Sequence, residues 1–224
     1  MEQIAKDAYL LDGFPKYVMN VYLLGDVLID AGTRFDAKRI LRQFQGRRVT
    51  AHALTHAHPD HQGASKVVCE TLNIPFWCGT HDVAVAESGD TTAQFPPPRH
   101  WSVGLQQRMI AGAGHPVARA LQEGDDVGGF TVVETPGHSP GHIAFWRESD
   151  RVLVLGDVLF NKHPVTGQVG LREPFAIWTP DPAQNRATAR KLAALRPATV
   201  CFGHGPPLRD EERFQSFVAQ LSAS

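Results

Sequence analysis

Short apolar runs recur along the chain, and most of them end in a polar loop. The runs at 18–24 and 27–29 flank Gly25-Asp26, a pair that is typical of a hairpin turn. Four further runs are rich in β-branched and aliphatic residues and have the length of buried strands. They cover residues 49–55, 130–134, 151–157 and 199–205. We therefore expect a core built largely from strands.

Apolar residues at helical spacing predict helices between these strands. One helix would start from a Thr33 cap and carry Phe35, Ile40, Leu41 and Phe44 as a stripe packed in the core. The other predicted helices cover residues 64–73, a segment from Asp181-Pro182 to near Arg196-Pro197, and residues from about 209 to 219. This mixture of elements indicates an α/β or α+β fold.

The loop after the strand at 49–55 reads His56-Ala57-His58-Pro59-Asp60-His61. In a chain of this composition such a motif arises by chance about once in a thousand cases. His56 and His58 are two apart in an extended segment and project to the same side, whereas the adjacent Asp60 and His61 must point apart or reach a second centre. We therefore predict a metal site whose four side chains are divided between two metals.

Three later strand ends carry donors of the same kind. His138 follows the strand at 130–134 in a loop preset by Pro and Gly, Asp157 ends the strand at 151–157, and His204 follows the last strand. A carboxylate has two oxygens and can bridge two cations. One such residue alone would be an ordinary cap or surface group, but donors at four strand ends indicate a shared site.

The order of these motifs, H-x-H-x-D-H, then G-H, then G-D, then G-H, resembles the metallo-β-lactamase superfamily over almost the whole chain. The segment Gly156-Asp157-Val158-Leu159-Phe160 is similar to the glyoxalase II pattern after its bridging aspartate, and within the superfamily the chain resembles the glyoxalase II-like or lactonase-like branch. The resemblance implies a four-layer αββα sandwich with the metal site at the open edge of the two sheets.

The resemblance also implies a set of ligands. His56, His58 and His138 match the ligands of a first metal. Asp60, His61 and His204 match those of a second. Asp157 matches the bridging aspartate, and Asp30 and His142 would support the ligands from behind without binding metal, because a ligating imidazole needs its other N–H held.

The composition fits one compact domain over residues 1–224. With 42% hydrophobic and 20% charged residues, the chain can bury a core without help from a metal, so the metals would be catalytic.

The three cysteines of the chain lack C-x-x-C spacing and are expected to be reduced. A net charge of −1 offers no global field for nucleic acid or a membrane, and we find no targeting or spanning segment. We expect a cytoplasmic monomer or homodimer acting on a small molecule.

Two segments with aromatic side chains are candidates for the walls of a substrate pocket. Residues 87–123 are interrupted by Gly and Pro, including the run 96–98, and are predicted to form a flap rather than a long element. Residues 160–178 follow Asp157 directly. Because binding sites are often built on such loops, we predict five substrate contacts. They are His100, Trp101, Phe160, His163 and Trp178.

The predicted reaction is metal-assisted hydrolysis. Two divalent cations lower the pKa of a shared water to about 7 and supply a bridging hydroxide, with Asp60 and Asp157 as the catalytic carboxylates around it. The target would be a carbonyl ester-type bond, that is, a thioester, a lactone or an ester. Imidazole and carboxylate donors without thiolate favour zinc, and they also suit iron or manganese.

Other activities share this set of donors. An iron-dependent persulfide dioxygenase would use a single iron on a His-His-Asp face. A nucleic-acid phosphodiesterase would use the same two metals but would need a basic docking surface. β-Lactamases mostly lack the aspartate that Asp157 matches, so antibiotic hydrolysis would be at best a side activity. The residue three after the bridging aspartate is Phe160, where the lactonases have a tyrosine.

Overall fold

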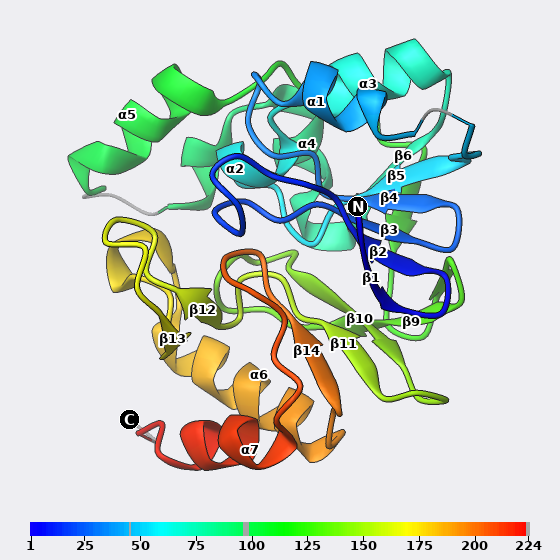
Figure 1. The fold of residues 1–224 in the computed structure, drawn as a ribbon. Helices are drawn as coiled ribbons and strands as arrows, with labels where there is room; N and C mark the ends of the chain where they lie inside the picture. Colours follow the sequence, from blue (N-terminus) through cyan, green and yellow to red (C-terminus); the bar gives the residue numbers. More distant parts are fainter. Residues whose placement is uncertain (45, 96–98, 223–224) are drawn as a thin grey trace.

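Two β-sheets packed face to face form the centre of the molecule, and helices cover their outer faces (Figure 1). The computed structural model describes residues 1–44, 46–95 and 99–222. The first sheet has seven strands in the order β1-β2-β3-β4-β5-β6-β7. They are β1 (Glu2–Ala5), β2 (Ala8–Leu10), β3 (Tyr22–Leu24), β4 (Val27–Ile29), β5 (Ala51–Ala53), β6 (Phe76–Gly79) and β7 (Arg119–Leu121).

The second sheet has five strands in the order β14-β11-β10-β9-β8, and a separate hairpin pairs β12 with β13. These strands are β8 (Asp126–Val127), β9 (Phe130–Glu134), β10 (Ile143–Arg147), β11 (Val152–Val154), β12 (Phe160–Lys162), β13 (Val169–Arg172) and β14 (Thr199–Cys201). The predicted hairpin around Gly25-Asp26 is confirmed, since β3 and β4 pair antiparallel.

Helices form the two outer layers. On the first sheet lie α1 (Ala37–Arg42), α3 (Ser65–Leu72) and α4 (Val83–Ser88), and on the second lie α6 (Pro182–Ala194) and α7 (Glu211–Ala219). The remaining helical segments are α2 (Pro59–Gln62), α5 (Trp101–Ile110) and the 3-10 turns η1 (Thr80–Asp82), η2 (Thr91–Gln94) and η3 (Ala176–Trp178). The predicted αββα sandwich is confirmed.

Both faces of the central strands are buried, which explains why their sequences are continuously apolar. In β11, Val152 and Val154 pack in the core between the sheets, whereas Leu153 packs in the core beneath α6 and α7. The same alternation divides Leu24 from Leu23 in β3. None of the described helices is both long and apolar enough to cross a membrane.

The helix predicted from Asp181-Pro182 is confirmed as α6. The Asp181 carboxylate accepts the backbone N–H of Gln184 at 2.9 Å, and proline occupies the first turn, where its missing N–H costs nothing. The terminal helix, α7, is capped in the same way by Asp210.

The prediction for the first helix was wrong at its start. Thr33 is not the cap, because its N–H and O–H both donate to the carboxylate of Asp36, which precedes α1. Phe35 therefore lies ahead of the helix and off its buried stripe, and it is 70% exposed with Arg34 stacked on its ring. Ile40 and Phe44 are buried as predicted.

The segment predicted as a flap contains more regular structure than its Gly and Pro content indicated. Trp101–Ile110 forms the ten-residue helix α5, and Arg119–Leu121 is an edge strand of the first sheet. A single glycine inside a helix costs only about 1 kcal/mol, so Gly104 does not end α5. The proline run at 96–98 lies outside the described residues.

We predict that Gly104→Ala stabilises the protein by about 1 kcal/mol, because a methyl group there meets nothing within 4 Å and removes the helix penalty of glycine. Gly63→Ala should be destabilising, since its methyl would lie 2.6 Å or less from the backbone of Thr33 and Arg34. Urea unfolding of both variants measures the difference. Equal changes in the free energy of unfolding for the two variants would contradict this account of α5.

Candidate metal centre

The ends of four strands deliver the predicted ligands to one place. The chain leaving β5 carries His56 and His58, and it then turns into α2 with Asp60 and His61. The second half of this motif was predicted as a loop, but Pro59 stands at the first helical position and presets the helical φ. The three later donors follow β9, β11 and β14. They are His138, Asp157 and His204.

The carboxylate of Asp157 lies at the middle of the group. Its Oδ2 is 3.1 Å from Nε2 of His204 and 3.4 Å from Nε2 of His61. The corresponding distances are 3.6 Å to His138 and 4.0 Å to His56. Gly203 leaves room for this carboxylate, because a Cβ there would stand 1.9 Å from its Oδ1.

The donors form two sets joined by a third, and each set has ligand atoms within 4.8 Å of one another. The first set is His56, His58 and His138. The second is Asp60, His61 and His204. The third set, which joins the two, is His56, His61 and Asp157. The structure therefore brings together all seven residues that the sequence assigned to two metals.

Hydrogen bonds on the outer side of the rings fix the tautomers of the imidazoles. The hydroxyl of Thr55 donates to Asp30, so it can only accept from Nδ1–H of His56 at 3.0 Å. In the same way the hydroxyl of Thr179 donates to the Phe175 carbonyl and accepts from Nδ1–H of His138. In both histidines Nε2 is left unprotonated and faces the cluster.

Two further imidazoles are held by acceptors that cannot donate. Nδ1–H of His61 donates to the Asp30 carboxylate at 2.9 Å, and Nδ1–H of His204 donates to the carbonyl of Val18. Within the described chain, Nε2 of four histidines is buried without a hydrogen-bond partner. They are His56, His58, His61 and His138. Buried, unpartnered nitrogens of this kind fit metal coordination, since leaving them unsatisfied is costly.

Asp30 and His142 lie behind the ligands, as predicted. Asp30 is buried and accepts the backbone N–H and the hydroxyl of Thr55 as well as the His61 ring. Nε2 of His142 accepts the backbone N–H of Asp157 at 3.1 Å, so its Nδ1–H donates to Thr135. Burial lowers the pKa of His142 to about 3, which keeps this ring neutral.

The charges of the cluster are strongly coupled. Burial alone would raise the pKa of Asp157, but the neighbouring His204 and His61 hold it well below its ordinary value. Burial lowers the pKa of His204, yet Asp157 and Asp60 outweigh this effect and raise it to about 10. Burial and neighbouring rings lower the pKa of His56 and His138. The half of the cluster around Asp60, Asp157 and His204 thus favours positive charge. In the other half, His56 and His138 offer neutral imidazoles.

Asp82 is a part of the site that the sequence did not reveal. This buried carboxylate accepts four hydrogen bonds, from the Ala57 N–H, the Ser139 hydroxyl, the Gly141 N–H and the Gln94 amide, at 2.7 to 3.1 Å. Asp82 thereby connects the His56–His58 segment to the loop of His138. A lone aspartate after a strand carries no motif, so only the fold shows this connection.

A cavity of about 150 Å³ faces the cluster. Phe160 and Trp178 line it as predicted, together with Gln106 and Ile110 from α5, which the sequence did not single out. Its remaining walls are Val18, Met19, Pro164 and ligands of the cluster. His100, Trp101 and His163 are absent from its lining.

These three residues lie outside the lining for local structural reasons, and their contact with a substrate stays a prediction. Trp101 is 72% exposed to solvent and is not among the residues that line the cavity. His100 instead caps α5, where Nδ1 accepts the N–H of Ser102. His163 is tied into its own turn by accepting the N–H groups of Val165 and Thr166.

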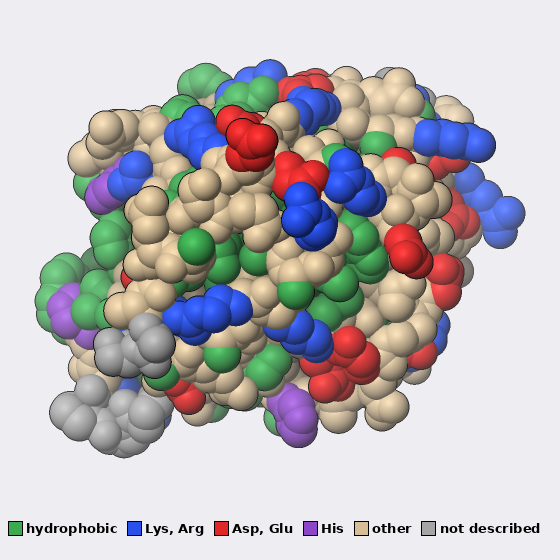
Figure 2. Space-filling model, turned by 90° about the horizontal axis from the view of Figure 1, so that it is seen from below, with side chains coloured by type: hydrophobic (Ala, Val, Ile, Leu, Met, Phe, Trp, Pro, Cys, Tyr) green, Lys and Arg blue, Asp and Glu red, His purple; other side chains and the backbone are tan. Residues whose placement is uncertain are grey.

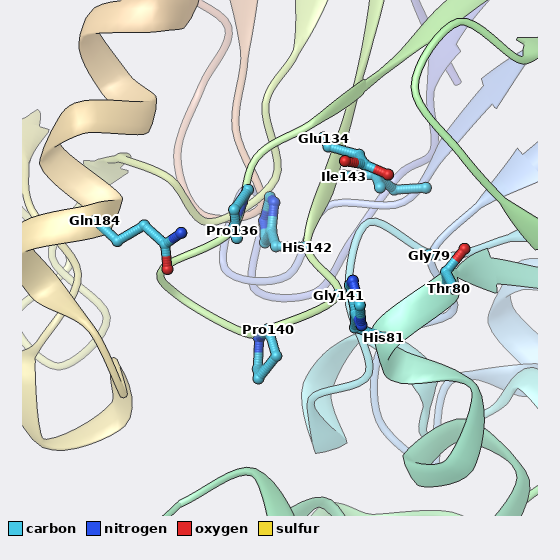
Figure 3. A pocket seen from close by; sticks show the side chains of 10 residues that line it. All are labelled: Gly79, Thr80, His81, Glu134, Pro136, Pro140, Gly141, His142, Ile143 and Gln184. Carbon is cyan, nitrogen blue, oxygen red and sulfur yellow. The ribbon is translucent and has the colours of Figure 1, made fainter.

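A second cavity, of about 340 Å³, shares no lining residue with the first. Figure 3 shows Gln184 of α6 on one side of it and His81 and Thr80 on the other, with His142 between them. No group of three potential metal ligands lies there among the described residues. The chemistry is concentrated in the smaller cavity.

The chain belongs to the metallo-β-lactamase superfamily, whose family model matches residues 17–204. Members of this superfamily are mostly metal-dependent hydrolases that bind divalent ions. The chain is 29% identical to the probable metallo-hydrolase YflN of Bacillus subtilis, over 94% of this chain and 89% of that protein. It is 29% identical to a hydroxyacylglutathione hydrolase of Methylobacterium nodulans, over 81% of this chain and 60% of that protein.

Solved structures agree with this assignment. TTHA1623 in a di-iron-bound form is 31% identical and superposes with a TM-score of 0.65, covering 90% of this chain and 88% of that one. The BLEG-1 B3 metallo-β-lactamase is 28% identical, with a TM-score of 0.64 over 90% and 93% of the two chains.

We predict that Asp82→Asn weakens metal binding at the set of His56, His58 and His138. All four partners of Asp82 donate, so the amide nitrogen of asparagine would face donors and push the two ligand segments apart. Metal affinity, measured by competition with a chelator, should fall by about tenfold or more. Asp125→Asn is the control, because this half-buried carboxylate pairs with Arg119 and belongs to none of the donor sets. Unchanged affinity in Asp82→Asn would contradict this role.

Proposed function

We propose that this protein is a dinuclear metal-dependent hydrolase that cleaves a carbonyl ester-type bond in a small molecule. The observation that carries the proposal is the convergence of Nε2 atoms from four buried histidines on the Asp157 carboxylate, with each Nδ1–H held from behind. Residues packed only for stability would not leave Nε2 of His56, His61 and His138 buried without a hydrogen-bond partner.

Seven residues would hold two metal ions. His56, His58 and His138 would bind the first. Asp60, His61 and His204 would bind the second. Asp157 would bridge the two, since its Oδ2 lies near histidines of both sets. Divalent cations at such a site lower the pKa of bound water to about 7 and polarise a carbonyl oxygen, which supplies a nucleophile without a reactive side chain.

The chain's own residues orient this chemistry. Asp30 directs the His61 ring itself and the His56 ring through Thr55. The carboxylates of Asp60 and Asp157 stay ionised, because the neighbouring histidines lower both pKa values despite burial. Both can therefore act as the catalytic carboxylates that hold a water molecule in position by accepting its hydrogen bonds.

The walls of the cavity favour an acyl substrate. The Phe160 ring lies 4.6 Å from the His204 ring and 6.4 Å from the His138 ring, so it covers the cluster and keeps bulk water away. Ile110, Pro164 and Trp178 continue this apolar surface. A thioester, ester or lactone with an apolar acyl part fits such walls better than a small charged molecule.

The relatives support this class without deciding the metal. Similarity to hydroxyacylglutathione hydrolases favours thioesters, although this chain spans only 60% of the relative from Methylobacterium nodulans. We propose zinc as the metal, because no thiolate takes part, and iron or manganese suit the same donors. The similar structure of TTHA1623 is a di-iron-bound form, which supports iron as the alternative.

Native protein should contain about two metal ions per chain, and His204→Ala should retain about one, because it removes a donor from the second set alone. Elemental analysis with spectroscopy gives the count and the metal. His81→Ala, an exposed histidine outside the cluster, should keep both ions. A single iron that His204→Ala does not change would favour the persulfide dioxygenase instead.

Lengthening the acyl chain of thioester or ester substrates should raise kcat/KM by about fourfold for each methylene that enters the cavity, since each buried methylene contributes about 0.8 kcal/mol. Trp178→Ala should flatten this dependence while both metals remain bound. Trp101→Ala is the matched comparison and should preserve it, because Trp101 lies outside the cavity. A native enzyme that prefers phosphodiesters, or shows no dependence on chain length, would refute the acyl assignment.

A further inference from the structure

Large hydrophobic side chains are exposed around the metal-facing cavity. Among the described residues nine such side chains are exposed, and six of them lie on α5, the β12–β13 hairpin and η3. We call these six the apolar rim: Trp101, Leu105, Met109, Val165, Val169 and Ile177. Figure 2 shows hydrophobic side chains gathered at the edge of the molecule where Figure 1 places α5 and β12–β13.

The apolar rim borders the mouth of the cavity. Four of its members are direct sequence neighbours of lining residues. These pairs are Leu105 with Gln106, Met109 with Ile110, Val165 with Pro164, and Ile177 with Trp178. A hydrogen bond of 2.8 Å from the Trp178 indole N–H to Ser102 ties η3 to α5. The elements that enclose the cavity are thus the same ones that present apolar groups to solvent.

The helix α5 exposes a row of large apolar side chains, in addition to the Val103 that it buries. Trp101, Leu105 and Met109 follow one another at intervals of four residues, and they are 72%, 44% and 55% exposed. The small polar Ser102 is buried as well. Contiguous exposed apolar surface of this kind marks an interaction site on soluble proteins.

Unpaired positive charge accompanies the apolar rim. Arg99 precedes α5, and Arg108 lies on this helix near its C-terminal end. The guanidinium of Arg34 donates to the backbone carbonyl of Arg108. All three are exposed, and within the described residues none has a carboxylate partner. No acidic residue occurs in Trp101–Ile110 or in the hairpin from 160 to 172.

We propose that the apolar rim and these three arginines dock onto an anionic phospholipid surface. Apolar side chains with Trp among them, flanked by arginine, insert at the boundary of headgroups and acyl chains, and the arginines attract acidic headgroups. A second copy of the chain is the poorer occupant, because it would bring the unpaired arginines of both copies together. The net charge of −1 argued against membranes, but it sums over the whole chain and conceals this local cluster.

Docking would place the mouth of the cavity against the lipid, so that acyl substrates enter without crossing water. This consequence rests on the proposed function, whereas the docking itself does not. It is measured by co-sedimentation of the full chain with vesicles of phosphatidylcholine and phosphatidylglycerol, compared with phosphatidylcholine alone.

Native protein should bind the anionic vesicles and bind neutral ones at least about tenfold more weakly. The double variant Arg99→Gln/Arg108→Gln should lose about 25-fold in partitioning, at about fivefold for each arginine. Leu105→Gln/Met109→Gln should lose at least about tenfold. Val67→Gln, an exposed apolar residue on α3 outside the rim, is the matched control and should bind like the native protein.

Equal binding to both kinds of vesicle, or equal losses in Val67→Gln, would overturn the proposal. Self-association of the native protein that Leu105→Gln/Met109→Gln abolishes, seen by sedimentation without vesicles, would assign the surface to a second copy instead. His204→Ala should still bind vesicles, which separates a failure of docking from a failure of the hydrolase assignment.

Discussion

The Asp157 carboxylate, buried among histidines of both donor sets, is the interaction on which this structure depends. Burying a carboxylate is costly unless opposite charge or hydrogen bonds compensate it. Here the compensation comes from His204 and His61, whose Nε2 atoms lie 3.1 and 3.4 Å from one carboxylate oxygen. His204 follows β14, His61 lies on α2 beyond β5, and Asp157 follows β11, so the sandwich must bring these strand ends to one edge for the carboxylate to be stable there.

Other buried carboxylates keep the two halves of the site in register. Asp30, at the end of β4, holds His61 directly and His56 through Thr55. Asp82, at η1, joins the backbone of Ala57 to the loop of His138. These groups make the donors rigid before any metal binds, and rigid ligands lose less freedom on coordination. The site is therefore a property of the scaffold as much as of its ligands.

Different elements around the site cover the donor cluster and form the entrance to the cavity. Phe160 covers the cluster from inside, whereas α5 and the β12–β13 hairpin shape the entrance and expose apolar side chains beside unpaired arginines. The two roles fall on different faces of α5, since Ile110 lines the cavity and Met109 faces solvent. One short helix can thus contribute to substrate selection and to docking through residues adjacent in sequence.

The sequence by itself determined which seven side chains are the candidate metal donors, because coordination demands particular side chains at particular spacings. It also indicated the ends of the strands that carry them, because strands buried on both faces are continuous apolar runs. It also determined the caps of α6 and the hairpin at Gly25-Asp26, which are local. Only the tertiary structure decided that Asp82 joins two ligand segments, that Phe35 and Trp101 are exposed, and that Gln106 and Ile110 face the cluster. These features depend on contacts between residues far apart in the chain, which local patterns do not encode.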